Sequence, residues 1–428
     1  MEYYNCIECV TVGTIIIRCN SKNAIAFNYY EGEVNIVSIE KYIVKETLEK
    51  LNTVPFAVKY KEEDEFVIGD GEPCFKVLIK KLPCKKELIT STSLALGEAY
   101  MNGDIDLIEG DLYFALNSIL SNIDKFNLDI KGLRKLLYTS TTSKHQKEEV
   151  CSHYDIGNDF YKLWLDKTMS YSCAYFKSED DTLEEAQLNK IHHILNKLRL
   201  DSSMSLLDIG CGWGYLLVEA AKKYKAHGVG ITLSEEQYKG ANKLIKDEGV
   251  EDYIEVKLMD YRDLKKSGMK FDRVVSVGML EHVGRDNYSL FFDNINAVLK
   301  DRGEFLLHYI SSLHESPGDP WIKKYIFPGG VIPSIREIMD IACEDKFYTV
   351  DVESLRLHYK RTLLCWYNNF ERNIDKIKEL VDEKFIRMWR IYLCSCAAAF
   401  NNGVVDVHQM LLTKGVNNEL PQTREYME

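Results

Sequence analysis

Long apolar runs are missing from this sequence. No stretch reaches the roughly 18 consecutive apolar residues of a membrane-spanning helix, and the first residues lack the basic segment and apolar core of a signal peptide. We therefore expect neither a spanning helix nor a leader. Basic residues are in the minority, because 54 Lys and Arg against 66 Asp and Glu give a net charge of −12. That balance argues against nucleic acid as a partner.

Paired cysteine motifs are missing as well, although the chain has 12 cysteines. Cys6 and Cys9 have the spacing of a metal site, but no second pair or histidine cluster accompanies them, so we expect no metal. Scattered thiols without a disulfide pattern suit a reducing compartment, and we expect a cytoplasmic protein. Internal repeats and low-complexity tracts are absent too. A chain of 428 residues suffices for two or three domains.

Three glycines at alternate positions, Gly210, Gly212 and Gly214, follow a short apolar strand and precede a helical segment, 215–224. Glycine allows a sharp turn and a close approach of a ligand, and the helix N-terminus offers free N–H groups. The pattern indicates a nucleotide or nucleoside site; a tight turn that binds nothing is the alternative. Dinucleotide sites use G-x-G-x-x-G with an acid about 20 residues on. Here the acid, Asp208, precedes the first glycine.

Apolar segments of strand length alternate with helical segments after residue 204, and a capping box at Ser234–Gln237 is expected to start one helix. The alternation predicts an α/β fold with a doubly wound parallel sheet. Ligands bind beyond the carboxyl ends of such strands, so residues there are expected to face one crevice. The predicted strands are 205–209, 228–233, 253–259, 271–277 and 304–309. The residues at or just past their ends are Gly210, Thr232, Asp260, Glu281 and His308.

Several long motifs follow one another in a recognisable order. They span residues 154–161, 169–176, 206–214, 260–264, 277–284, 306–310, 320–330 and 359–367. Together they resemble the cyclopropane-fatty-acyl-phospholipid synthase family of S-adenosylmethionine-dependent methyltransferases, over roughly residues 140–415. The resemblance implies a Rossmann-like class I methyltransferase sheet with a smaller α+β N-terminal domain.

The resemblance also implies a reaction. A methylene group is transferred from S-adenosylmethionine to the cis double bond of an unsaturated acyl chain in a membrane phospholipid, with bound bicarbonate as the general base. The family residues that hold the ion map to Cys173, Glu281, His308, the backbone of Ile310, and Tyr359. A buried anion needs such donors. Each side chain also has a plainer interpretation: a buried thiol, a half-buried histidine, a glutamate at a helix start and a core tyrosine.

For the cofactor, the family places the three glycines around the methionine portion. Asp260 and Tyr261 would border the adenine, and Thr232 and Gln237 would lie near the ribose, although a capping role explains Gln237 equally well. The predicted cofactor-binding residues are Tyr171, Ser172, Asp208, Gly210, Gly212, Gly214, Thr232, Gln237, Asp260 and Tyr261. A related enzyme that makes a methyl-branched lipid or methylates a small molecule is an alternative, and so is an inactive lipid-binding scaffold.

Proline is scarce, and four of its eight positions fall between Pro317 and Pro333, together with Trp321, Tyr325 and Phe327. This stretch predicts an irregular loop that acts as a lid. Its aromatic residues would suit the walls of an acyl-chain site, and closure would keep water from a cationic intermediate. A packed surface excursion is the alternative.

The N-terminal region differs in character. We expect a domain over 1–135, a polar linker over 136–150 and the catalytic domain over 151–428. The small domain would capture lipid or contact a second subunit of a homodimer, or be structural only. Its predicted strands are 55–60, 65–71 and 75–80, and its predicted helices are 94–103 and 111–122. Transient contact with the inner face of the membrane is expected from the substrate alone, because an acidic chain is not attracted to anionic lipid.

Overall fold

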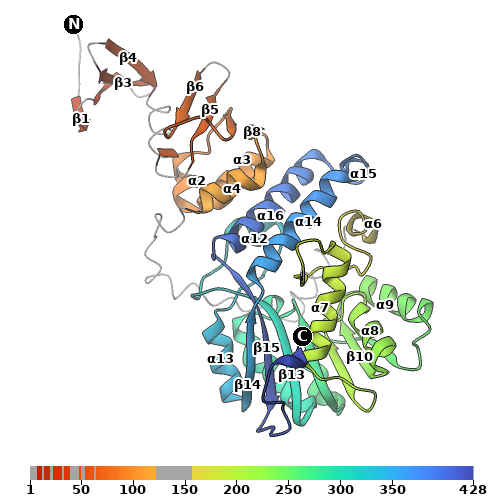
Figure 1. Ribbon diagram of the computed structural model, residues 1–428. Helices are drawn as coiled ribbons and strands as arrows, with labels where there is room; N and C mark the ends of the chain where they lie inside the picture. Colours follow the sequence, from red (N-terminus) through yellow and green to blue (C-terminus); the bar gives the residue numbers. More distant parts are fainter. Residues whose placement is uncertain are drawn as a thin grey trace. The chain divides into compact units, whose positions relative to one another are not determined.

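The computed structural model describes residues 54–61, 64–121 and 157–427. Before them it describes four strands and residues 48–49. The chain falls into two compact units: Met1–Lys85 with Glu98–Asn127, and Lys86–Gly97 with Leu128–Glu428. Figure 1 labels the elements of both. The predicted linker, 136–150, lies outside the described residues, and our limits for the two domains stay a prediction.

The first unit is built from two four-stranded sheets. One has the order β1-β2-β3-β4 and is antiparallel, and the other has the order β6-β5-β7-β8, in which β5 and β7 are parallel. The ring centroids of Phe56 and Phe75 stack 4.9 Å apart in the core of the second sheet. The structure confirms the three predicted strands and both helices, whereas β8 and the first sheet were not predicted. The elements that begin in this part of the chain are β1 (Ile7–Thr11), β2 (Thr14–Cys19), β3 (Asn23–Tyr30), β4 (Glu33–Ser38), β5 (Phe56–Tyr60), β6 (Asp64–Ile68), β7 (Lys76–Ile79), α2 (Lys85–Thr90), α3 (Thr92–Met101), β8 (Ile105–Glu109) and α4 (Leu112–Leu120).

The second unit contains a seven-stranded sheet of order β11-β10-β9-β12-β13-β15-β14. The first five strands in this order are parallel, and β15 runs antiparallel to both of its neighbours. This architecture confirms the predicted α/β class and its doubly wound parallel core. The strands are β9 (Ser205–Ile209), β10 (His227–Thr232), β11 (Ile254–Leu258), β12 (Phe271–Val277), β13 (Leu299–Ser311), β14 (Phe347–Ser354) and β15 (Asp406–Lys414).

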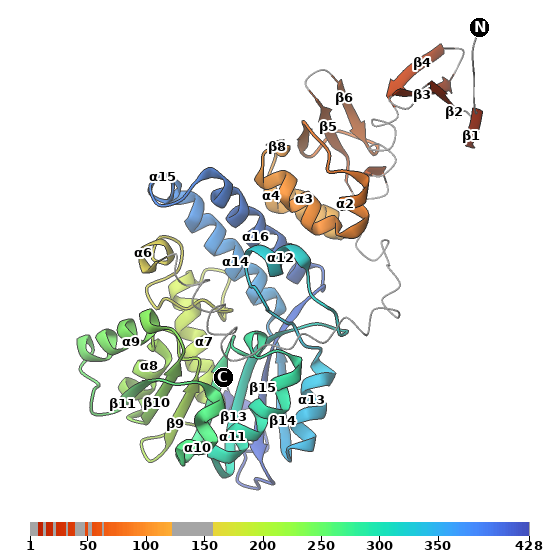
Figure 2. The same cartoon turned by 180° about the vertical axis from the view of Figure 1, so that it is seen from behind.

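Helices cover both faces of this sheet. One face carries α7, α8 and α9 (Figure 1), and the other carries α10, α11 and α13 (Figure 2). Successive strand residues point to opposite faces, so Leu206 packs in the core of the first face and Leu207 in that of the second. The helical elements are α6 (Asn158–Tyr161), α7 (Leu183–Lys197), α8 (Tyr215–Tyr224), α9 (Glu235–Asp247), η4 (Tyr261–Asp263), α10 (Leu264–Ser267), η5 (Leu280–His282), η6 (Arg285–Asn287), α11 (Tyr288–Val298), α12 (Pro320–Tyr325), α13 (Ile335–Glu344), α14 (Arg356–Arg372), α15 (Ile374–Lys378), α16 (Glu383–Asn401) and η7 (Glu425–Met427).

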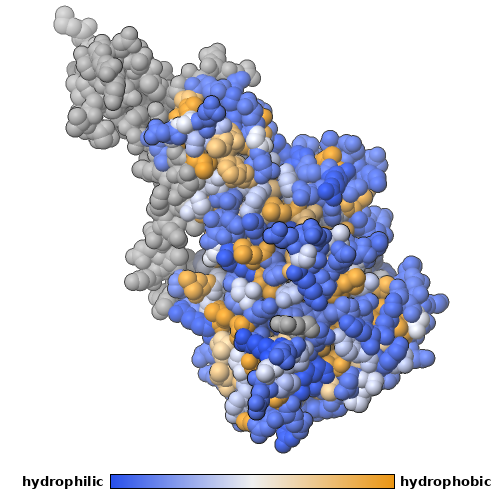
Figure 3. Space-filling model, in the orientation of Figure 1, coloured by the Kyte–Doolittle hydropathy of each residue, from blue (hydrophilic) through white to orange (hydrophobic). Residues whose placement is uncertain are grey.

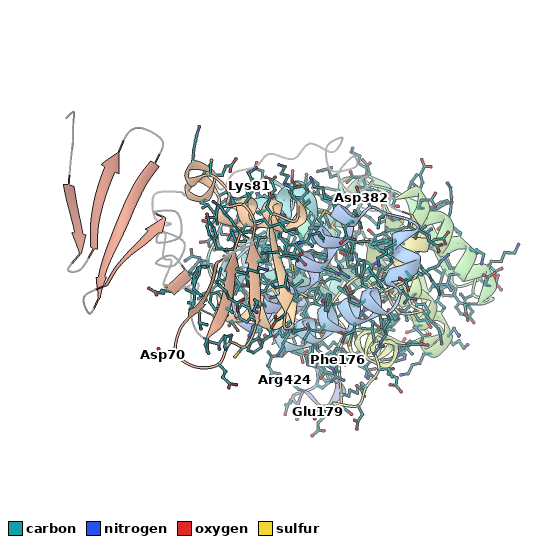
Figure 4. The ribbon with its side chains drawn as sticks, turned by 90° about the horizontal axis from the view of Figure 1, so that it is seen from above. Asp70, Lys81, Phe176, Glu179, Asp382 and Arg424 are labelled. Carbon is teal, nitrogen blue, oxygen red and sulfur yellow. The ribbon has the colours of Figure 1, made fainter. Side chains whose placement is uncertain are left out.

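The long helices α14 and α16 lie side by side beyond the carboxyl ends of the parallel strands (Figures 1 and 2). Asp382, labelled in Figure 4, begins α16 by accepting a hydrogen bond from the backbone N–H of Phe385. An aromatic core holds this layer together: the ring of Trp164 lies 5.6 Å from Trp366 of α14 and 5.5 Å from Trp389 of α16. These helices therefore form a rigid roof over the end of the sheet where a ligand is expected.

Two details differ from the sequence prediction. Strand β13 covers 13 residues rather than 304–309, so His308 lies inside the strand and not at its end. At Ser234 only half of the capping box forms: the side chain accepts from the N–H of Gln237, while the Gln237 side chain bonds to Thr232 instead. The buried hydroxyl of Thr232 offers that side chain a partner, which explains the second difference.

No helix in the described part of the chain is both long and apolar enough to cross a bilayer. On the face in Figure 3, apolar residues of the described part occur in small groups between polar ones.

Strand β10 approaches α8 closely because it has glycine at two positions of one face. A Cβ atom on Gly228 would lie 2.8 Å from Leu217, and one on Gly230 would lie 2.7 Å from Leu217 and 2.8 Å from Cys211 Sγ. All three distances are shorter than van der Waals contact. The glycines thus fix how near α8, and the glycine turn that precedes it, can lie to the sheet.

We predict that Gly230→Val lowers the free energy of unfolding by about 1–3 kcal/mol, the usual cost of overpacking a dense core. It should also weaken binding of S-adenosyl nucleotides, because the displaced Cys211 belongs to the glycine turn. Chemical denaturation and calorimetric titration measure the two effects. The matched control is Glu255→Val at an exposed position of neighbouring β11. A Gly230→Val protein as stable as the control would contradict the packing argument.

Candidate active site

A cleft with an empty volume of about 1180 Å³, partly open to solvent, lies at the carboxyl ends of β9, β10 and β12. Eight of the ten predicted cofactor-binding residues line it: Tyr171, Ser172, Asp208, Gly210, Gly212, Thr232, Gln237 and Tyr261. The other two predicted residues, Gly214 and Asp260, do not line the cleft. Gly214 is the N-cap of α8, and Asp260 caps η4 by accepting from the N–H of Arg262 at 2.9 Å.

The glycine turn gives this cleft its open floor. Gly212 has φ +55°, and no atom lies within 4 Å of the place where a Cβ would stand. Gly210 has φ +81°, and a Cβ there would come within 3.0 Å of Met279. Such backbone angles favour glycine. The turn therefore exposes its backbone to the cleft without side chains in between.

One end of the cleft is uncharged. The hydroxyl of Thr232 donates to Gln237 Oε1 at 2.8 Å, and both residues are buried. Tyr261 is buried, with its ring 5.3 Å from Phe291 and beneath the guanidinium of Arg262. Amide, hydroxyl and aromatic groups of this kind suit a nucleoside.

The other end holds the ionisable groups. Asp208 and Lys190 are 3% and 4% exposed. Burial raises the pKa of Asp208 to about 7, although the charge of Lys190 opposes the shift. Burial likewise lowers the pKa of Lys190 to about 8. The Lys190 ammonium donates to Ser172 Oγ at 3.1 Å. Lys190 was not among the predicted site residues. Its place on the buried face of α7, beside Gln187 and Ile191, is a feature of the sequence that could have identified it.

The predicted anion-binding residues do not line this cleft. The side chain of Glu281 reaches back to β13, where its Oε1 accepts from the backbone N–H of Ile310 at 2.6 Å. The N–H that we expected to bind the ion therefore bonds to Glu281. Burial raises the pKa of Glu281 to about 7, and the hydrogen bond from Ile310 opposes part of that shift.

His308 lies two residues before Ile310, on the same face of β13. Burial lowers its pKa to about 3, so the imidazole is neutral. The amide of Gln409 on β15 donates to His308 Nδ1 at 3.3 Å, which places the imidazole proton on Nε2. Gln409 was not identified from the sequence, because only the antiparallel pairing of β13 with β15 brings it opposite His308.

The thiol and phenol of the set are protonated. Cys173 is fully buried, and burial raises its pKa well above the ordinary value. Its Sγ lies 3.7 Å from the carbonyl of Leu355, in the turn before α14. Burial also raises the pKa of Tyr359, and the charges of Cys173 and Glu281 contribute to that shift, so the three groups lie near one another.

Two buried polar atoms of this set, Glu281 Oε2 and His308 Nε2, have no hydrogen-bond partner among the described residues. A buried polar group without a partner is costly. The set therefore offers an imidazole N–H and a phenol as donors, a carboxyl group, and a thiol that here donates to backbone carbonyls of Ala174 and Leu355. Its chemistry fits a small anion.

Comparison with known proteins shows the family to which the chain belongs. A family model described as mycolic acid cyclopropane synthetase matches residues 141–410, and one described as a domain of unknown function matches 43–131. The chain belongs to the mycolic acid cyclopropane synthetase family. Cyclopropane-fatty-acyl-phospholipid synthase of Escherichia coli K12 is 40% identical over 83% of this chain and 92% of its own. A probable fatty acid methyltransferase of Pseudomonas putida is 38% identical over 87% of this chain and 96% of its own.

Solved structures of the family show the same sheet. The cyclopropane synthase MmaA2 from Mycobacterium tuberculosis is 35% identical, with a TM-score of 0.59 over 63% of this chain and 98% of that one. Mycolic acid cyclopropane synthase CmaA1, solved with S-adenosylhomocysteine (SAH) and CTAB, is 36% identical with the same TM-score and coverage. This chain is therefore an S-adenosylmethionine-dependent methyltransferase. Its cleft fits that cofactor.

The predicted lid of the methyltransferase is more ordered than we expected. Residues Pro320–Tyr325 form α12, with Asp319 as its cap, and Trp321 is buried. Of the three aromatic residues, Phe327 turns towards the site, with its ring 6.5 Å from Tyr171 and 6.1 Å from His282. Both of those residues line the cleft.

Arg285 holds the two ends of the lid together. Its guanidinium donates to the carbonyls of Ser316 and Ile332, each at 3.0 Å, and to Glu337 at 2.8 Å. The N–H of Val331 also donates to the carbonyl of Glu281 at 2.9 Å. No local sequence pattern marks Arg285, which connects the turn that carries Glu281 to both ends of the predicted lid.

The buried carboxyl of Glu281 makes a prediction about stability and pH. Folding raises the pKa of Glu281 from 4.5 to about 7. The contribution of this group to the free energy of unfolding is therefore highest below pH 4.5 and decreases as the pH rises from 4.5 through 7. Glu281→Gln removes this titration. Relative to the unmodified protein, the variant should therefore gain about 1–3 kcal/mol between pH 5 and pH 8.

Chemical denaturation of the ligand-free protein at both pH values measures this difference. The control is Glu179→Gln, an exposed position labelled in Figure 4. Parallel stability curves for Glu281→Gln and the unmodified protein would show that Glu281 does not titrate in this range.

Proposed function

We propose that this chain transfers a methylene group to the cis double bond of unsaturated acyl chains in membrane phospholipids and closes a cyclopropane ring. The proposal rests on one observation. Outside the cofactor cleft, two buried polar atoms, Glu281 Oε2 and His308 Nε2, have no hydrogen-bond partner among the residues that the structure describes. Simple methylation of a nitrogen or oxygen needs no second anion site of this kind.

Bound S-adenosylmethionine would supply the one-carbon unit, and bound bicarbonate would supply a base for the proton that ring closure releases. The chain's own residues hold that base. The neutral imidazole of His308 presents its Nε2–H, and burial keeps the groups of Cys173 and Tyr359 protonated as donors. Glu281, with a pKa of about 7, exchanges a proton readily near neutral pH.

The surroundings would protect a cationic intermediate from water. Aromatic rings enclose the site from several elements: Tyr171 and Tyr392 join their hydroxyls at 2.7 Å, and Phe327 of the lid lies 6.0 Å from Tyr392. Exclusion of water prevents hydrolysis of reactive intermediates. The same rings would offer an apolar wall to an acyl chain.

The membrane enters the proposal through the substrate, because the acyl chains of phospholipids lie in a bilayer. We propose a cytoplasmic protein that contacts the inner face of the membrane transiently. The homodimer, and the role of the N-terminal domain in lipid capture or subunit contact, stay predictions.

The first test is mass spectrometry of lipids after incubation of purified protein with S-adenosylmethionine and vesicles of unsaturated phospholipid. We expect a mass increase of one methylene group per acyl chain together with loss of the double bond. Retention of the double bond would support the second candidate, a methyl-branching enzyme, which the name of the Pseudomonas putida relative favours. No lipid product from protein that binds SAH would overturn both.

A second prediction concerns the base. Removal of dissolved carbonate by degassing should lower turnover at least tenfold, and added bicarbonate should restore it, because the donors of Cys173, His308 and Tyr359 would then hold no proton acceptor. Turnover is measured by SAH release, with chloride at equal ionic strength as the control. Unchanged turnover without carbonate would contradict a bound-ion base.

Cys173→Ser should lower turnover sharply while SAH affinity stays near normal.

A further inference from the structure

The proposed lipid chemistry assigns no step to the lysine at the wall of the cleft, although its charge also acts on Cys173 and His308. Lys190 projects from α7 and is 4% exposed. Among the described residues its side chain donates a hydrogen bond to Ser172 Oγ at 3.1 Å and forms no ion pair with a carboxylate. A buried ammonium is costly unless a negative charge or several acceptors face it. The Lys190 ammonium therefore has N–H groups that can donate to a ligand in the cleft.

Charge in the cleft is confined to one end. Among the described residues that line it, Lys190 is the one lysine or arginine and Asp208 the one carboxylate. The two are near enough for each to shift the pKa of the other, yet they form no direct ion pair. Asp208 stands two residues before Gly210, which places it at the glycine turn, and Lys190 lies near enough to interact with it. Tyr261 and Gln237 belong to the uncharged end.

A pair of opposite charges held apart matches a zwitterion. The methionine portion of the cofactor carries an α-carboxylate and an α-ammonium on one carbon, whereas its adenosine portion has no carboxylate or ammonium. We propose that Lys190 binds the α-carboxylate of S-adenosylmethionine and of SAH, with Asp208 facing the α-ammonium. This rests on the methyltransferase assignment and is independent of the lipid product.

The alternative is that Lys190 serves only the fold, by balancing Asp208 and the partly buried Asp166, whose charges both raise its pKa. The two roles predict different responses to the ligand. A carboxylate-binding lysine distinguishes SAH from the same molecule without its carboxylate. A lysine that only supports the fold affects both ligands alike.

The experiment is calorimetric titration of SAH and of decarboxylated SAH, which differs only by loss of the carboxylate. The unmodified protein should bind SAH at least tenfold more tightly than the decarboxylated form. In Lys190→Met that preference should fall to less than twofold, through weaker binding of SAH and not through stronger binding of the other ligand. Lys190→Arg, which keeps the charge, should retain most of the preference. The matched control is Lys239→Met, an exposed lysine of α9.

Equal loss of affinity for both ligands in Lys190→Met would overturn the proposal, and so would an unchanged preference for SAH. If Lys190→Met does not fold, the unmodified protein and Lys190→Arg still test it, because equal affinity of the unmodified protein for the two ligands contradicts a carboxylate site. Failure of the unmodified protein to bind either ligand would instead count against the methyltransferase cofactor itself.

Discussion

Burial of ionisable side chains at the carboxyl edge of the parallel strands is the constraint on which the rest of the structure depends. Burial raises the pKa of Asp208 and Glu281 to about 7 and lowers the pKa of Lys190 to about 8 and of His308 to about 3. Each shift brings the group nearer to its neutral form. Near neutral pH, Asp208 and Glu281 are therefore partly protonated and His308 is neutral, whereas Lys190 stays mostly charged.

The fold maintains that burial through close packing on each side. Glycine in β10 lets α8 lie directly on the sheet, and the aromatic core around Trp164 fixes the roof of α14 and α16. Packed cores of this density transmit small displacements. A loosened helix or roof would admit water and return the pKa values towards their ordinary range, so packing far from the ligand contributes to the electrostatics of the site.

The sequence predicted the parts of this fold that depend on local pattern. Apolar periodicity identified β9 to β13 because each is a continuous strand between helices. The same approach missed β14 and β15, since the last strand in the chain inserts between β13 and β14 and only long-range pairing determines its place. Gln409 was missed for that reason. Lys190 could have been found as a charge in an apolar stripe, whereas nothing local marks Arg285 as the residue that joins the two ends of the lid.

One short turn divides the two compartments. The three residues of η5 point in three directions: Leu280 into the core, Glu281 towards Ile310 of β13, and His282 into the wall of the cofactor cleft. Any movement that brings His282 towards a bound cofactor therefore also moves the carboxyl group on the other side. Val331 and Arg285 join the 316–332 segment to this turn by hydrogen bonds, so the segment, the wall of the cofactor cleft and Glu281 are linked directly. In the proposed reaction a base must act only on the substrate cation, and these hydrogen bonds connect the residue proposed to exchange protons with the segment that covers the site.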